Sequence, residues 1–264
     1  FVTKSGENDA LHLYDVMRAK RVETFRFRSL VGIGSASWSP DGKQVVFSSI
    51  DKSGNNDLYI LNIETKELRK LTNDYYDDRD PAWSPDGKKI AFASDRTPFG
   101  TNNKNNLFLY DVETGAIDYL TYGNDNYLSP AWSKDGSRIA FTCDKGGVQN
   151  VWLMDMSKKF AGRRLDSLSG YPARPAGGRS MTKVTQFTTA AFDPTWTSNG
   201  DLVFTAFEKF SFQIRMVKNI LAVADTSTTV ALIDLYNKEK TWEAKSIAGT
   251  AEIKSYKYQG EYRL

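Results

Sequence analysis

The chain has 264 residues, enough for one large all-β domain or two small domains with a buried core. Hydrophobic residues make up 40% and aromatic residues 13%, which indicates a globular chain rich in ring side chains. The formal net charge is only +3, so no concentrated positive face and no nucleic-acid partner are expected. The single cysteine, Cys143, excludes an internal disulfide. No apolar run is long enough to cross a bilayer, so no membrane insertion is expected of this segment.

Residues 1–27 predict the back part of a β unit. Leu11 to Asp15 forms an alternating strand pattern that matches Leu107 to Asp111 later in the chain, and residues 21–27 follow as an outer strand. No segment corresponds to the first strand of the later units. Either the C-terminal end supplies that strand and closes a ring, or the chain is cut from a larger multidomain protein. Because the chain starts in the middle of a unit, the second alternative, a chain cut from a larger protein, is favoured.

A tryptophan-centred segment then recurs four times, spaced by 45, 49 and 64 residues, and the last copy is worn. The copies are Ala36–Gly42, Pro81–Gly87, Pro130–Gly136 and Pro194–Gly200. Each tryptophan is followed after eight or nine residues by a phenylalanine, namely Phe47, Phe92, Phe141 and Phe204. A third apolar run follows, and in the three clearest copies it ends at an Asn or Asp.

The chemistry of one unit predicts four short antiparallel strands. Ser-Pro-Asp-Gly is a tight turn between two strands, because Pro presets one position and Gly accepts positive φ. Asp41, Asp86 and Asp135 are therefore interpreted as turn residues. Four strands in about 40–45 residues are typical of a propeller blade. At least four four-stranded blades are expected, and Trp38, Trp83, Trp132 and Trp196 should lie largely buried at equivalent positions on first strands.

These residues resemble the TolB family of WD-like propeller repeats over residues 1–218. The match is best at residues 81–111, which read Pro-Ala-Trp-Ser-Pro-Asp-Gly, Ile-Ala-Phe, Ser-Asp-Arg and Asn-Leu-Phe-Leu-Tyr-Asp. The resemblance implies an all-β propeller of four-stranded antiparallel blades, six or seven in the whole ring, with about five units here. It also implies a non-catalytic scaffold for protein–protein interaction in the periplasm or cell envelope.

Two alternatives stay open. The chain could be the accessory or gating propeller of a serine peptidase whose catalytic domain lies outside it. It could also be a propeller glycosidase, which needs only two converging carboxylates. A catalytic site within the chain is not expected, because its only histidine, His12, occupies a strand-packing position and no zinc or P-loop motif is present.

Two segments depart from the repeat. Residues 157–180 contain four glycines, two prolines and six basic residues against one acidic residue, which predicts a basic surface insertion. Residues 219–264 predict a degenerate blade, a closing strand or the start of a following β domain.

Strand polarity separates the loops of an antiparallel blade into two ends. The Ser-Pro-Asp-Gly turns lie at one end, and the longer, varied loops that precede first strands or follow second strands lie at the other. Varied loops on a rigid scaffold are where recognition is usually built. The candidate partner-binding residues in these loops are Tyr75, Tyr76, Asp77, Asp78, Arg79, Asp95, Arg96, Asp125 and Tyr127. No cofactor is expected, although Ca²⁺ is a candidate ligand of Asp77, Asp78 and Asp80.

Overall fold

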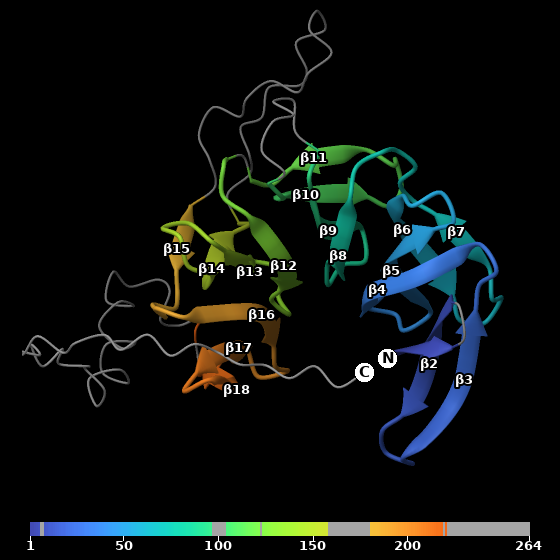
Figure 1. Cartoon of the computed structure of the whole chain (residues 1–264), viewed down its shortest axis with the longest axis horizontal. Helices are drawn as coiled ribbons and strands as arrows, with labels where there is room; N and C mark the ends of the chain where they lie inside the picture. The colour runs from blue at the N-terminus through green and yellow to red at the C-terminus, as the bar shows by residue number, and fades with distance from the viewer. Residues whose placement is uncertain (6–7, 97–103, 122, 158–179, 219, 221–264) are drawn as a thin grey trace, which may run out of the picture.

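Each repeat folds into one antiparallel sheet, and the computed structural model arranges five such sheets radially (Figure 1). The structure describes residues 1–5, 8–96, 104–121, 123–157, 180–218 and 220. All the elements bounded within these residues are β-strands. In this part of the chain no helix is long and apolar enough to span a membrane.

The sheets follow one another in chain order. The first contains β1 (Val2–Ser5), β2 (Asn8–Asp15) and β3 (Lys20–Arg26). The second contains β4 (Leu30–Trp38), β5 (Gln44–Asp51), β6 (Asn56–Asn62) and β7 (Leu68–Lys70). The third contains β8 (Asp78–Trp83), β9 (Lys89–Ser94), β10 (Asn106–Asp111) and β11 (Ile117–Tyr119). The fourth contains β12 (Tyr127–Trp132), β13 (Arg138–Cys143), β14 (Asn150–Asp155) and β15 (Met181–Lys183). The fifth contains β16 (Ala190–Trp196), β17 (Leu202–Glu208) and β18 (Ser211–Val217).

Every strand pairs only with its neighbours in sequence, which is the meander of a propeller blade. The predicted all-β propeller with about five units is therefore confirmed. Within the described residues three sheets have four strands and two have three, so the expected minimum of four four-stranded blades stays a prediction. The first sheet begins at the second strand of its unit, and the fifth ends at the third strand. The total of six or seven blades stays a prediction, and residues 158–179 and 221–264 lie outside the described part.

The hydrophobic core is divided among the interfaces between successive sheets. One cluster, for example, joins Val46 and Leu58 of the second sheet to Phe92 and Phe108 of the third. The repeated phenylalanines sit in these interfaces, and Phe47, Phe92 and Phe141 are fully buried. Burying such a side chain contributes about 1.5–3 kcal/mol. Sheet-to-sheet packing of this kind produces the radial arrangement, because each sheet needs a neighbour on both faces.

The four tryptophans occupy equivalent positions at the ends of β4, β8, β12 and β16, as predicted. Their predicted burial is only partly correct, because Trp83 is 7% exposed but Trp38 is 47% exposed. The Trp196 indole reaches the first strand of the preceding sheet, where it donates a hydrogen bond to the carbonyl of Ala131 on β12 (3.0 Å). Within the described residues the sheet before Trp38 has no first strand, so that tryptophan lies open.

The two Ser-Pro-Asp-Gly turns and the Ser-Lys-Asp-Gly turn at Asp135 share the same core hydrogen bonds. Ser84 Oγ donates to Asp86 Oδ1 (2.6 Å). Asp86 Oδ1 also accepts from the backbone N of Lys88 (3.1 Å). Gly87 takes a φ of 69°, which explains the glycine at this position. Equivalent contacts recur at Asp41 and Asp135. The interpretation of these aspartates as turn residues is confirmed.

The two ends of the blades differ as predicted. The backbone N of Val112 donates to the carbonyl of Lys88 (2.9 Å), which places the turn after a third strand beside the turn after a first strand. We call this end the turn face. At the other end, the backbone N of Tyr127 donates to the carbonyl of Asn105 (2.8 Å), so the loop before a first strand lies beside the loop after a second strand. We call that end the loop face.

Candidate functional site

Two tyrosines project from the loop that joins β7 to β8 on the loop face. The ring centroids of Tyr75 and Tyr76 lie 4.2 Å apart, and the Tyr75 hydroxyl donates to the Tyr76 hydroxyl (2.8 Å). Tyr75 is 80% exposed, whereas Tyr76 is half-buried with the guanidinium of Arg96 5.3 Å from its ring centroid. The hydrogen bond from Tyr75, together with burial, raises the pKa of Tyr76 to about 12. The pair therefore forms an aromatic platform with one ring in solvent.

Arg96 anchors this loop through ion pairs with two of its aspartates. Its Nη2 lies 2.5 Å from Asp78 Oδ2 and 3.3 Å from Asp74 Oδ2, and the Arg96 side chain is only 12% exposed. The guanidinium also lies 5.4 Å from the ring centroid of Phe92. Asp78 is fully buried, and burial raises its pKa although the charge of Arg96 opposes this effect. Arg96 and Asp78 therefore position the loop and are not surface contacts.

Asp77, Arg79 and Asp95 form a second group beside the tyrosines. Asp77 pairs with Arg79 and accepts a hydrogen bond from Asn56 Nδ2 (2.6 Å). The backbone N of Asp77 donates to Asp95 Oδ1 (2.8 Å), and burial raises the pKa of Asp95. The next blade repeats this anchor, because the backbone N of Asn126 donates to Asp144 Oδ1 (2.7 Å). Asp95 is thus part of the loop scaffold, while Arg79 keeps 40% of its side chain exposed.

Asp125 and Tyr127 differ in how far their side chains are buried. Tyr127 is 4% exposed and packs in the core with Phe141, so its placement among the surface residues of the loop face is wrong. Its hydroxyl lies 3.5 Å from Asp125 Oδ2, and burial raises its pKa. Asp125 remains half-buried at the surface of the loop. The alternation of strand β12 points Tyr127 inward.

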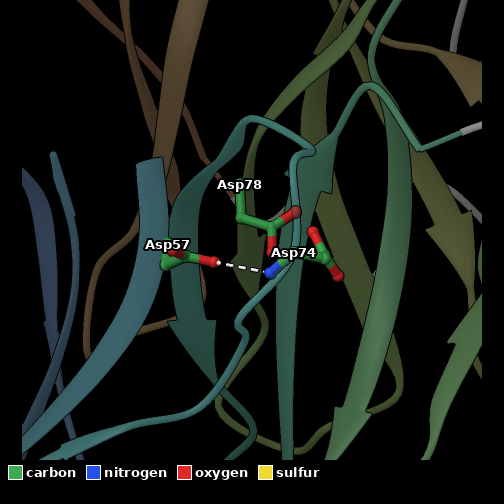
Figure 2. A group of neighbouring side chains, drawn as sticks. All are labelled: Asp57, Asp74 and Asp78. Carbon is green, nitrogen blue, oxygen red and sulfur yellow. Dashed lines mark hydrogen bonds between the residues drawn. The ribbon is translucent and has the colours of Figure 1, made fainter. Parts of the chain in front are cut away.

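The three predicted cation ligands do not converge. Asp77 faces Arg79, and Asp80 lies on the inner strand, where its contacts are to serines. Asp78 instead meets Asp57 and Asp74, with one side-chain oxygen of each residue within 4.8 Å of the others (Figure 2). The backbone N of Asp74 donates to Asp57 Oδ1 across 3.4 Å. The sequence-based ligand set is therefore corrected to Asp57, Asp74 and Asp78 as the carboxylates that come together.

Asp57 holds a position that the repeat uses to fix the next loop. In the following blades this position is an asparagine, and Asn106 Oδ1 accepts from the backbone N of Gly123 (3.1 Å). Asn150 Oδ1 accepts in the same way from Phe187 (2.8 Å). Asp57 replaces the neutral amide by a charge, and Lys70 Nζ lies 2.7 Å from its Oδ2. The second blade thus brings a buried charge into an otherwise neutral loop anchor.

The inner strands carry a belt of polar residues around the central axis. The residue three places before each tryptophan is Ser35, Asp80, Ser129 or Asp193, and we call these four the axial belt. Ser35 Oγ donates to Asp80 Oδ1 (2.7 Å), the backbone N of Ser129 donates to Asp80 Oδ2 (3.1 Å), and Ser129 Oγ donates to Asp193 Oδ1 (2.7 Å). The belt thus connects four neighbouring blades.

Backbone strain accompanies the belt. Asp80, Ser129 and Asp193 have φ values of 53°, 50° and 51°, and each lies at a bulge in the pairing of its inner strand. Such conformations cost about 1–3 kcal/mol each and persist where the surrounding structure holds them. The belt lines a central cavity of about 410 Å³, together with the adjoining prolines and tryptophans. The axis is therefore polar and acidic within the part of the chain that is described.

One exposed aromatic residue was missed from the sequence. Lys209 and Phe210 form the two-residue turn between β17 and β18, with φ values of 48° and 61°. Two positive φ values define a type I′ turn, which normally selects Asn or Gly, so the sequence carried no turn signal here. Phe210 is 98% exposed on the loop face. The axial belt was also missed, although aligning the repeats three residues before each tryptophan would have revealed it.

The His12 side chain is buried and lies within hydrogen-bonding distance of two threonines of the first sheet. Its Nε2 lies 2.7 Å from Thr3 Oγ1 and its Nδ1 lies 2.9 Å from Thr24 Oγ1, and the residue is 6% exposed. Both ring nitrogens of the only histidine are thus engaged inside the first sheet. A Ser-His-Asp constellation cannot use this residue without rebuilding the sheet.

Comparison with known proteins agrees with the repeat. Residues 1–101 match the family model of the TolB beta propeller domain. Over these residues the repeats are similar to the TolB type. No curated protein matched the sequence. The strand pairing and the tryptophan positions described above carry the same repeat through residue 217.

Solved structures share the fold at low sequence identity. TolB from Acinetobacter baumannii is 22% identical with a TM-score of 0.62, and the match covers 82% of this chain and 47% of that one. A TolB candidate from Agrobacterium tumefaciens is 20% identical with a TM-score of 0.58, covering 75% and 65%. The tricorn protease is 14% identical with a TM-score of 0.51, covering 78% and 22%. The chain spans about half to two thirds of the length of the two TolB structures.

Proposed function

We propose that the chain is a non-catalytic propeller scaffold that binds a protein partner through its loop face, in the periplasm or cell envelope. The contrast between the two ends of the blades carries the proposal. The turn face repeats one hydrogen-bonded turn, whereas the loop face presents different side chains in each blade. Two of them, Tyr75 and Phe210, are 80% and 98% exposed.

Exposed aromatic residues on a rigid support suit protein recognition. Aromatic side chains are enriched among the residues that dominate binding energies. Tyr75 is supported by Tyr76 and Arg96, and Phe210 by a two-residue turn, so little conformational entropy is lost when either is covered. The envelope location is part of the proposal and is supported by the TolB-type repeat.

The test compares aromatic removal on the two faces. The double variant Tyr75→Ala/Phe210→Ala should lose partner capture from an envelope extract, while Val16→Ala/Met17→Ala on the turn face should retain it. Val16 and Met17 are matched controls, because they are apolar and 81% and 94% exposed. The captured protein is then identified, purified and titrated against each variant, and at least a tenfold loss of affinity is expected for the loop-face variant. Equal affinities would place the binding surface elsewhere.

A second candidate is the accessory propeller of a serine peptidase. It is supported by the fold that this chain shares with the tricorn protease. The two candidates differ in whether a domain with a catalytic nucleophile is joined to the propeller, because a peptidase needs one. Isolating the full-length protein and measuring its hydrolysis of short peptides distinguishes them. Hydrolysis that depends on a serine outside this chain would favour the peptidase.

A further inference from the structure

We propose that Asp57, Asp74 and Asp78 form a Ca²⁺ site between the second and third blades. The site lies beneath the loop that carries Tyr75 and Tyr76. It does not depend on the identity of a protein partner. Four observations support it, namely the charge balance, the spacing of the oxygens, an unpartnered buried oxygen and the departure of Asp57 from the repeat.

The charges around the three carboxylates do not balance. Lys70 pairs with Asp51 and Asp57, Arg96 pairs with Asp74 and Asp78, and Arg79 pairs with Asp77. Asp95 also interacts with Arg79 and Arg96, so six carboxylates share three cations. Asp57 and Asp78 are fully buried. Uncompensated charge at buried positions is costly, and one divalent cation would offset two of the three excess negative charges.

One oxygen of Asp78 is buried without a hydrogen bond, whereas Asp74 Oδ1 already accepts from the backbone N of Tyr76 (3.1 Å). Lys70 and Arg96 contact the Oδ2 atoms of all three residues. The Oδ1 atom of Asp78 is buried and accepts no hydrogen bond of ordinary geometry, although the hydroxyls of Thr72 and Ser94 lie nearby. The Oδ1 atom of Asp57 accepts only the long 3.4 Å bond from the backbone N of Asp74. Figure 2 shows Asp57, Asp74 and Asp78 on neighbouring segments, with the hydrogen bond from the backbone N of Asp74 to Asp57 dashed.

The number of carboxylate ligands favours Ca²⁺ over Mg²⁺. The three oxygens lie within 4.8 Å of one another. Ca²⁺ binds oxygen at about 2.3–2.6 Å, so ligands on opposite sides of the ion lie about 4.6–5.2 Å apart. Mg²⁺ keeps several waters and is usually bound through one or two carboxylates, so a site of three carboxylates suits Ca²⁺ better. Carboxylate oxygens are the ligands that Ca²⁺ prefers, and water can complete its shell.

The repeat provides a substitution that should preserve the fold. Asn106 and Asn150 already perform the structural role of Asp57 in the next two blades. Asp57→Asn should therefore keep the hydrogen bond to the loop and remove one charged ligand. Asp74→Asn is a second ligand variant at a half-buried position. Asp125→Asn, in the equivalent loop of the next blade, is the matched control.

The experiment uses the whole chain after treatment with EDTA, with Ca²⁺, Mg²⁺ and Tb³⁺ as probes. Tyr76 should sensitise Tb³⁺ luminescence, because it lies two residues from Asp74. Ca²⁺ should displace Tb³⁺, with a Kd of about 10⁻⁵–10⁻³ M, and should raise the Tm by about 5–10 °C at a hundredfold excess over Kd. Mg²⁺ should do neither at the same concentration.

Asp57→Asn and Asp74→Asn should each weaken Ca²⁺ binding at least tenfold, and Asp125→Asn should leave it unchanged. Circular dichroism of the EDTA-treated variants checks that each is folded. Absence of saturable Ca²⁺ binding by the wild-type chain would overturn the proposal. Unchanged affinity in folded Asp57→Asn and Asp74→Asn would also overturn it, because the ion would then be bound elsewhere.

Discussion

Removing the charge of Arg96 tests whether the loop below Tyr75 is held by one buried ion pair. Arg96→Met keeps much of the side-chain volume and leaves Asp78 buried without its cation. Asp78 has no exposed side-chain surface, and its Oδ2 lies 2.5 Å from Arg96 Nη2. Removing one partner of a buried pair costs about 3–5 kcal/mol, because the other charge is left uncompensated. Arg96→Met should therefore lower the free energy of unfolding by about that amount.

The control is a surface pair of the same chemistry. Arg215 lies 2.5 Å from Glu208 and is 46% exposed. Arg215→Met should cost less than about 1 kcal/mol, because solvent screens exposed pairs. Urea unfolding followed by tryptophan fluorescence, with EDTA present, gives both values.

A double-mutant cycle separates the pair from the packing of the Arg96 stem. In an Asp78→Asn background no buried charge remains at this position, so Arg96→Met should cost less than about 2 kcal/mol. The pH dependence gives a second check. Burial raises the pKa of Asp78, and losing Arg96 raises it further because the opposing charge is gone. The protonated carboxyl needs no cation, so the cost of Arg96→Met should be smallest near pH 4 and grow as the pH rises through the raised pKa. A cost that is the same in both backgrounds, or independent of pH, would refute the reasoning.

Two further predictions concern the repeat itself. Trp83→Ala should cost about 3–5 kcal/mol and Trp38→Ala less than half as much, because Trp83 is 7% and Trp38 47% exposed; equal losses in urea unfolding would mean that Trp38 is covered in solution. Asp86→Ala should cost about 1 kcal/mol at pH 7 by removing the hydrogen bonds from Ser84 and Lys88. The hydrogen bond from Ser84 lowers the pKa of Asp86, so this difference should shrink as the pH falls below about 4, and a difference that grows in acid would contradict the turn geometry.

Much of the loop face was predictable from strand polarity and the repeat. The sequence placed Tyr75, Tyr76 and Arg79 in a varied loop, and the structure keeps them at the surface to different extents. It did not distinguish these residues from Tyr127, because both kinds of position lie near the start of an inner strand. Strand alternation and a one-residue bulge decide which side chain points outward.

The sequence by itself determined the blade, because its signals are local. Ser-Pro-Asp-Gly selects a turn from its own backbone preferences, and alternating apolar residues select the strands that flank it. Only the tertiary structure decided what lies between blades. Asp57 and Asp78 are separated by 21 residues and meet through the packing of two sheets, and the axial belt joins residues from four blades. Contacts of this kind depend on how neighbouring sheets pack and on where their bulges lie. Neither can be predicted from a local sequence pattern.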